Sequence, residues 1–313
     1  MKILHDLERW TSAGAITGAQ HDAIAELVRK DRFSVFVELN TLLYLGVLAF
    51  IGGVGWTIQT HFASLGDAAI LSALTLTFCF CLYYCFSRAL PYSSAQVESS
   101  GFAFDYVLYL GCLVLALEFG YLESQFHILQ DGWDNYLLIS AFVFFVLAYR
   151  FDNRFVLSLA LSTLAGWFSL RLTHFPDVGG PSVRTSGLVY GGLVAVAGTG
   201  LYKAGVKKHF LETYLHVAGN VLFIALLSGV ASDEYGPYLL GLLGLSVTAI
   251  ALGVRFKRFA FVVYGIGYGY IGVSIRLLRE INSFTAGLAY VAVSSTAVIV
   301  TLAAIARRFG REE

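Results

Sequence analysis

The chain has 313 residues, a formal net charge of zero and a mean hydropathy of +0.71. Hydrophobic residues make up 57% of the sequence and charged residues 13%, whereas soluble domains average about 25% charged residues. This composition excludes an ordinary soluble protein, and the short polar gaps exclude a soluble catalytic domain. We therefore expect an integral membrane protein with the lipid bilayer as its main partner and no nucleic-acid partner.

Ten apolar stretches approach the roughly 20 residues needed to cross a bilayer as a helix. Because lipid cannot satisfy open backbone groups, stretches of this length predict an all-α membrane helix bundle with about ten transmembrane helices. The stretches are Leu39–Thr60, Asp67–Phe86, Phe102–Leu122, Asn135–Tyr149, Phe155–Thr173, Gly187–Tyr202, Phe210–Val230, Tyr235–Val254, Phe259–Leu278 and Thr285–Ala306.

Basic residues alternate between the gaps. Seventeen of the 21 Lys and Arg residues lie in the N-terminal segment, in every second gap and in the C-terminal tail. The other gaps hold only Arg184 and Arg279, while Arg171 and Arg276 lie just inside the ends of stretches. Basic loops remain cytoplasmic, so we expect both termini to face the cytoplasm.

We divide the chain into a cytoplasmic helical hairpin (1–38), a transmembrane bundle (39–306) and a basic cytoplasmic tail (307–313). In the first part Thr17 and Gln20 have the spacing of a capping box for a helix over Gly18–Lys30. Two helices of this size are too small for a core of their own. The hairpin is therefore expected to lean on the membrane or the bundle, or to bind a cytoplasmic protein partner.

The N-terminal part carries a recognisable pattern of residues. The pattern is Leu7-x-x-Trp10-x-x-x-Gly14-x-Ile16, then Gln20, Tyr44-Leu45-Gly46 and Gly52-Gly53-Val54-Gly55-Trp56. Over about sixty residues it resembles domain-of-unknown-function family 2157, a group of bacterial multi-span membrane proteins. The family's first span commonly ends in an Asn-Trp-Asp-like element, but this chain has Gln59-Thr60-His61-Phe62 there. The resemblance implies a bacterial inner-membrane protein and supplies no activity.

A weak internal similarity links residues 135–173 with residues 238–278. A shift of 105 positions aligns Arg150-Phe151 with Arg255-Phe256, and 169–172 with 274–277. The alternatives are a parallel repeat, as in some transporters, and chance similarity between apolar helices.

Two motifs favour packing over chemistry. Residues 267–272 match the dinucleotide fingerprint G-x-G-x-x-G, but they lie within an apolar stretch and lack the preceding strand. We interpret Gly265 and Gly269, one turn apart, as a surface for close helix packing. The four cysteines lie inside apolar stretches without zinc-site spacing and are expected to be packing residues.

Ionisable residues inside spans need partners. Glu118, Arg171 and Arg276 are predicted at the same outer depth, where Glu118 could pair with one or both arginines. Alternatively, the arginines could bind an anion or lipid headgroup, or extend alone to the interface.

The seventh stretch contains Glu212, His216 and Asn220 at steps of four residues. Steps of four keep side chains on one helix face, so we predict a stripe that points into the bundle, with Asp105 as its acidic neighbour. The stripe is either a hydrogen-bonded seam or a proton- or cation-accessible path in which His216 titrates near neutral pH.

Chemical motifs are otherwise scarce. His61, His127 and His174 lie on the predicted outer side without close spacing, so we expect no metal site and no cofactor. No catalytic arrangement stands out, and we expect that the protein is not an enzyme.

Two functions remain. The first is a transporter or permeation protein for a small polar or charged solute. The alternative is a non-catalytic membrane scaffold or sensor that binds a partner through residues 1–38. A third, weaker option is a lipid-acting enzyme or flippase at the outer arginines.

Overall fold

The computed structural model describes residues 10–12, 14–21, 36–97, 101–129, 132, 134–173, 181–281 and 283–309. Within these residues the regular structure is helical, as the apolar stretches predicted. The long helices are α3 (Phe36–Leu65), α4 (Asp67–Arg88), α5 (Phe102–Phe126), α6 (Asn135–Phe151), α7 (Arg154–Thr173), α8 (Pro181–Lys203), α9 (Leu211–Val230), α10 (Tyr235–Arg255), α11 (Phe259–Glu280) and α12 (Phe284–Phe309). A short 3₁₀ helix, η2 (Lys208–Phe210), leads into α9.

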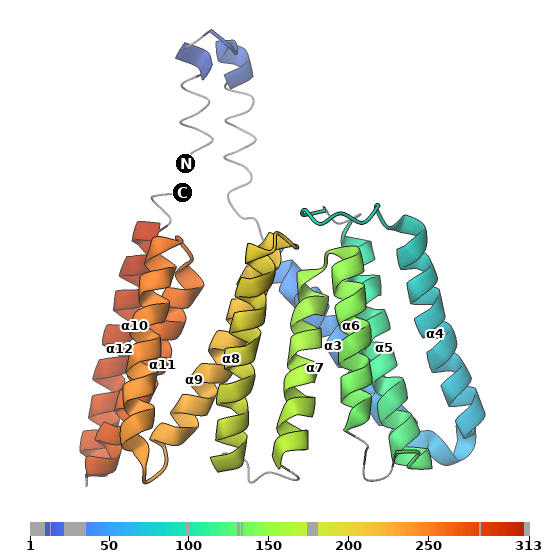
Figure 1. Ribbon diagram of the computed structural model, residues 1–313. Helices are drawn as coiled ribbons and strands as arrows, with labels where there is room; N and C mark the ends of the chain where they lie inside the picture. The colour runs from blue at the N-terminus through green and yellow to red at the C-terminus, as the bar shows by residue number, and fades with distance from the viewer. Residues whose placement is uncertain are drawn as a thin grey trace.

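The helices stand side by side as successive antiparallel hairpins (Figure 1). The closest packing is within the pairs α4–α5, α6–α7, α8–α9 and α10–α11, while α3 packs on α5 and α12 on α11. The row places α9 between two hairpins, in contact with α7 on one side and with α10 and α11 on the other. It is therefore the helix through which the two halves of the bundle meet.

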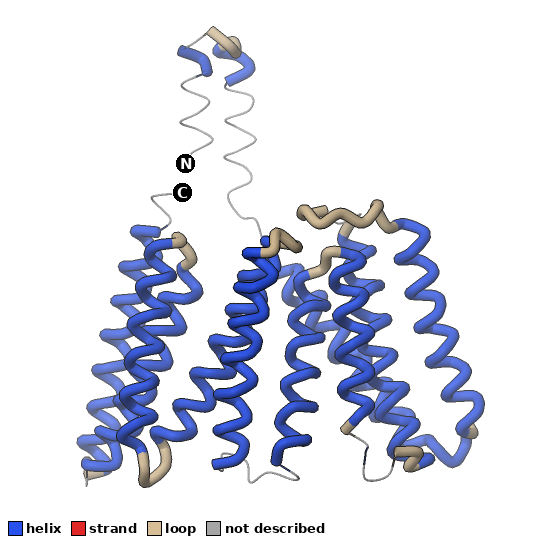
Figure 2. The backbone as a smooth tube through the Cα atoms, viewed as in Figure 1, coloured by secondary structure: helices blue, strands red, loops and turns tan. Residues whose placement is uncertain are grey.

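The connections that the sequence predicted to be basic lie together at one end of the bundle. The turns after α6, α8 and α10, the segment after α4 and the end of α12 all lie at this end (Figure 2). We call it the basic end and the other the opposite end. Since each hairpin reverses the chain, the alternation of charge along the sequence becomes a separation of charge between the two ends.

Six helices of the described chain are long and apolar enough to cross a membrane: α4, α5, α9 with η2, α10, α11 and α12. Shorter apolar segments lie at Thr41–Thr57 in α3 and across α6. Helices α7 and α8 occupy the fifth and sixth predicted stretches, but serine, threonine, glycine and arginine lower their hydropathy. Ten helices thus occupy the predicted positions, while ten membrane crossings remain a prediction.

Close packing of α11 against α10 depends on glycine. A methyl group at Gly265 would lie 2.6 Å from the carbonyl oxygen of Ser246, whereas one at Gly267 would meet nothing within 4 Å. The fingerprint-like residues 267–272 lie inside α11, and the element that precedes α11 is the helix α10. The interpretation of this motif as a packing surface is therefore confirmed.

The hairpins of the proposed repeat turn in a similar way. Helix α6 is followed by Asp152 at a φ of 58° and α10 by Phe256 and then Lys257 at 54°. In the hairpin between them, Lys207 has a φ of 44°. All three are non-glycine residues in the left-handed region, which such residues seldom adopt. The parallel repeat itself remains a prediction.

In the N-terminal segment, the amide of Gln20 donates to Thr17 Oγ1 at 3.4 Å and the amide of Thr17 donates to Gln20 Oε1 at 2.9 Å. These reciprocal bonds form the predicted capping box. Most of the predicted hairpin, including residues 22–35, lies outside the described residues.

Candidate functional site: a polar stripe along α9

Glu212, His216 and Asn220 follow one face of α9 from its first turn toward its middle. We call them the α9 stripe. Because α9 rises about 1.5 Å per residue, the stripe covers roughly 12 Å of helix. Its three side chains all meet residues of α11 or of the turn that precedes α11. The stripe therefore lies in a helix interface.

Glu212 is held by two arginines from different hairpins. Its Oε2 lies 3.4 Å from Nη1 of Arg154, at the start of α7, and its Oε1 lies 3.2 Å from Nη1 of Arg258, just before α11. The side chain of Glu212 is 24% exposed, while those of Arg154 and Arg258 are 44% and 57% exposed. This carboxylate thus links three elements and stays accessible to solvent.

His216 lies one turn further into the bundle. Its Nε2 is 3.9 Å from Glu212 Oε1, which is too long for a hydrogen bond. The imidazole stacks on Phe261 with ring centroids 4.7 Å apart and an interplanar angle of 4°. Its other nitrogen, Nδ1, is buried without a hydrogen-bond partner. Such a group costs free energy to bury, so the site keeps a polar atom where packing alone would favour carbon.

Asn220 ends the stripe. Its Nδ2 donates to the backbone oxygen of His216 at 2.8 Å, and its Oδ1 accepts from the hydroxyl of Tyr268 on α11 at 2.9 Å. Polar neighbours thus continue from Glu212 through His216 and Asn220 to Tyr268.

A cavity of about 380 Å³ adjoins the start of the stripe. Glu212 lines it together with Lys257 and Arg258, and Phe259 and Phe309 supply apolar walls from α11 and α12. The cavity lies at the basic end of the bundle. It can admit water or a small solute to the Glu212 carboxylate.

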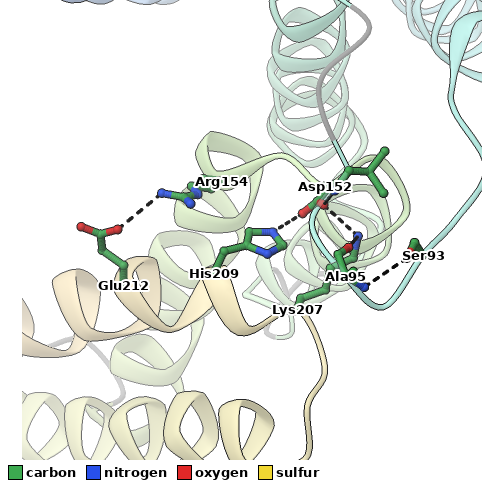
Figure 3. Close-up of polar contacts among 8 residues, drawn as sticks. Ser93, Ala95, Asp152, Arg154, Lys207, His209 and Glu212 are labelled. Carbon is green, nitrogen blue, oxygen red and sulfur yellow. Dashed lines mark hydrogen bonds and ion pairs between the residues drawn. The ribbon is translucent and has the colours of Figure 1, made fainter. Parts of the chain in front are cut away.

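A second carboxylate at the same end has a different environment (Figure 3). Asp152, after α6, contacts Lys207 Nζ at 3.0 Å through Oδ2 and His209 Nε2 through Oδ1. The side chains of Asp152 and Lys207 are only 2% and 1% exposed, and that of His209 is 12% exposed. We call these three residues the Asp152 cluster.

The Asp152 cluster holds the extended segment that follows α4. The amide of Val97 donates to Asp152 Oδ2 at 2.5 Å, and Lys207 Nζ donates to the carbonyl of Ala95 at 3.3 Å. The backbone amide of Lys207 also donates to Ser94 at 2.9 Å. One buried ion pair thus joins the α4–α5, α6–α7 and α8–α9 connections, which is a structural role.

Asp105, predicted beside the α9 stripe, belongs to another set of contacts. Its Oδ1 accepts a hydrogen bond from Asn153 Nδ2 at 2.8 Å, and Asn153 also caps α7 by accepting from the amide of Val156. Asp105 therefore anchors the α6–α7 turn to α5. The charged side chains next to Glu212 are those of Arg154 and Arg258, and Asp105 is not among the contacts described for the α9 stripe.

The three residues of the predicted outer cluster have three different neighbours. Glu118 accepts a hydrogen bond from Thr75 Oγ1 on α4 at 2.5 Å. Arg171 lies 3.7 Å from Asp134, beyond hydrogen-bond distance, and Arg276 lies over the ring of Tyr235 with 3.4 Å to its centroid. The structure does not gather them into one ion cluster, because they lie on helices that face different neighbours.

Metal ligation finds little support in the described residues, which contain no group of three His, Cys, Asp or Glu able to hold an ion. Cys81, Cys85 and Cys112 are buried as free thiols between α4 and α5, and Cys79 is exposed. Of the three outer histidines, His174 lies outside the described residues, as does the side chain of His61.

Sequence reasoning overlooked Asp152 and His209 and counted Lys207, Arg154 and Arg258 only as loop charges. The available signal in the sequence was an aspartate within an otherwise basic gap, together with a later gap that holds three lysines and a histidine. Periodicity could not reveal it, since these residues lie in turns rather than on helix faces.

Comparison with known proteins shows that part of the chain is similar to one protein family. Residues 8–157 match the family described as "Predicted membrane protein (DUF2157)". The resemblance seen in the sequence is confirmed, and it extends well past the first sixty residues. No curated protein and no solved structure matches the chain.

The DUF2157 match covers α3 to α6 and ends at the start of α7. Together with the apolar helices it supports a membrane protein. It includes Asp105, Asp152 and Arg154, whereas the α9 stripe lies beyond it. The family's description gives a location and no reaction, so any function must be argued from the site.

Proposed function

We propose that the protein is a transport or permeation protein for a small polar or charged solute, with the α9 stripe as the entry path for a proton or cation. The observation that carries the proposal is that Glu212, His216 and Asn220 follow one face of α9 and that Asn220 is hydrogen-bonded to Tyr268 of α11. Residues of this kind inside a membrane are costly, and they commonly mark ion and proton pathways.

The cavity beside Glu212 supports the same proposal. It opens at the basic end, where a solute would first meet a carboxylate flanked by two arginines. His216 follows, with its Nε2 3.9 Å from Glu212 Oε1, and an imidazole can take up and release a proton. Asn220 and Tyr268 then extend hydrogen-bonding groups toward the middle of α9 and α11.

The proposal includes an orientation. We place the protein in a bacterial inner membrane with ten crossings, the basic end in the cytoplasm and both termini there. The support is the gathering of the basic connections at one end, as the positive-inside rule requires. In this orientation the cavity beside Glu212 opens to the cytoplasm.

Proton entry into sealed proteoliposomes tests the path. The purified protein is reconstituted around a trapped pH-sensitive dye, and a potassium diffusion potential drives protons inward. We expect flux above that of protein-free liposomes and a loss of that flux in His216→Ala. The unfolding free energy should fall only by the lost stacking on Phe261, about 0.5–1.5 kcal/mol, because Nδ1 has no hydrogen bond to lose.

The control is His127→Asn. This exposed histidine follows α5 at the opposite end, and asparagine tolerates its φ of 48°. Its flux should equal that of the wild type. Wild-type flux no higher than in empty liposomes, or unchanged flux in a folded His216→Ala protein, would reject the proposal.

The scaffold or sensor remains the alternative, supported by the start of the DUF2157 match at residue 8, within the N-terminal segment. A scaffold gives no proton flux in either protein. The same experiment therefore separates the two functions.

A further inference from the structure

A second cavity, of about 480 Å³, lies between α7, α8 and α9 in the half of the bundle away from the basic end. This is within the range of about 300–1,000 Å³ found for small-molecule sites. Its walls are mainly apolar and include Ala165 from α7 and Val221, Ile224 and Ala225 from α9. Ile224 is 58% exposed, so the cavity opens on the surface that faces lipid in a membrane.

Glycines shape the walls of this cavity. Gly187 of α8 lies so close to α9 that an added methyl would come within 3.0 Å of Ala225 Cβ. Gly166 contributes a wall without a side chain from α7. Helices α8 and α9 thus pack tightly behind the cavity, while space remains toward α7.

One fully charged side chain lines this apolar space. Arg184, in the first turns of α8, is only 7% exposed. Its Nη1 donates to Ser232 Oγ at 3.5 Å, and its guanidinium carbon lies 4.8 Å from the ring centroid of Tyr238. Residues of the α9–α10 turn and of α10 therefore fix the position of the guanidinium. Hydroxyl groups of Ser169, Ser186 and Ser228 also line the cavity.

We propose that this cavity binds an acidic phospholipid, with an acyl chain along the apolar walls and its phosphate at Arg184. An arginine fork pairs with phosphate through two parallel hydrogen bonds, and serine hydroxyls can donate to the remaining oxygens. A small polar solute would leave the apolar walls of the cavity in contact with water. An amphiphile instead places an apolar chain against these walls and a charged group at Arg184. The opening at Ile224 lets the chain enter sideways from the bilayer.

This site is separate from the α9 stripe. Glu212 lies in the first turn of α9, while Val221, Ile224, Ala225 and Ser228 lie in its second half. The inference therefore does not rest on the proposed transport function, and either can fail alone.

Lipid retention measured by native mass spectrometry tests the inference. The delipidated protein is mixed with phosphatidylglycerol and phosphatidylcholine of identical acyl chains. Both lipids carry a phosphate, but the choline ammonium of phosphatidylcholine offsets its charge and would lie close to the guanidinium of Arg184. We therefore expect phosphatidylglycerol to be retained at least about tenfold better, a difference of about 1.4 kcal/mol. Arg184→Gln should remove this preference, and Arg184→Lys should keep part of it.

Two further variants control the result. Arg279→Gln removes an exposed cation at the same end and should leave the preference unchanged. Ile224→Trp should fill the mouth of the cavity and reduce the retention of both lipids while Arg184 stays in place. This variant keeps the inference testable if Arg184→Gln fails to fold.

Equal retention of the two lipids by the wild type overturns the proposal, as does an unchanged preference in folded Arg184→Gln. Thermal stabilisation by inorganic phosphate equal to that by phosphatidylglycerol overturns it too, because the acyl chain would then contribute nothing.

Discussion

Asp152 and Glu212 lie at the same end of the bundle, each carboxylate between two nitrogen-bearing side chains, yet their surroundings differ. Asp152 is 2% exposed and its partners Lys207 and His209 are nearly as buried. Glu212 is 24% exposed, its arginines are more exposed still, and a cavity adjoins it. Burial and full coordination indicate a structural bond, whereas accessibility indicates a site at which solutes or protons can exchange.

The Asp152 cluster should give the largest loss of stability. Asp152→Asn leaves the ammonium group of Lys207 buried without its counter-ion, which typically costs about 3–5 kcal/mol. We expect a loss of this size in the free energy of unfolding, measured by denaturant titration in mixed micelles. The extended segment after α4 should also become more sensitive to protease, because the asparagine amide offers one acceptor oxygen where the carboxylate offers two to Val97, Lys207 and His209.

The double variant Asp152→Asn with Lys207→Met is the control for this interpretation. It removes the buried positive charge, so it should recover much of the lost stability. A single variant as stable as the wild type would show that the cluster does not hold the three connections together.

Packing behind the α9 stripe should give the next largest effect. Helix α11, which supplies Phe261 and Tyr268, is held against α10 at Gly265. Gly265→Ala places a methyl 2.6 Å from the Ser246 carbonyl and should cost about 1–3 kcal/mol. Gly267→Ala, on an open face of the same helix, should be neutral or stabilising, because alanine favours helices by up to about 1 kcal/mol. Equal unfolding midpoints for the two variants would contradict this account of the packing.

Removing the Glu212 carboxylate should affect stability much less than removing that of Asp152. Both of its ion pairs are partly exposed, and such pairs contribute roughly 0–1 kcal/mol each after screening by solvent. Glu212→Gln should therefore lower the unfolding free energy by less than about 2 kcal/mol while reducing proton flux strongly. Raising the salt concentration should narrow the gap between Glu212→Gln and the wild type. A loss in Glu212→Gln as large as that in Asp152→Asn would remove the contrast between the two sites.

The Asp152 cluster and the α9 stripe also show which features of the structure could be predicted from the sequence. The positions of α3 to α12 followed from hydropathy, because runs such as 67–86 and 210–230 need no tertiary information to be identified as helices. The shared face of Glu212, His216 and Asn220 followed from the helical period. Partners on other helices could not be derived in this way: depth placed Asp105 near Glu212, but which helix adjoins α9 depends on lateral packing, which hydropathy does not encode.

Turn residues were the hardest to predict. Asp152 meets Lys207 and His209 because the α6–α7 and α8–α9 connections converge at one end, and their separations of 55 and 57 residues carry no periodic signal. Arg258 reaches Glu212 for the same reason. Their charge predicts that they share one end of the bundle, while their contacts depend on loop geometry.

The smallest expected effect on stability lies at the inner end of the α9 stripe. Tyr268→Phe removes the hydroxyl that donates to Asn220 Oδ1 at 2.9 Å. The stacking of this ring on Phe223, with centroids 4.7 Å apart, should remain. Hydrogen bonds between membrane helices contribute about 0.6 kcal/mol on average, so the unfolding free energy should fall by about that amount. If the stripe is a path, proton flux should fall far more than this small change in stability would explain.

Tyr270→Phe is the matched control, because it removes a hydroxyl that lies 3.0 Å from Ser294 on α12, away from the stripe. Equal flux in the two folded variants would make the contact between Asn220 and Tyr268 a seam between helices, and the path would then have to end at His216.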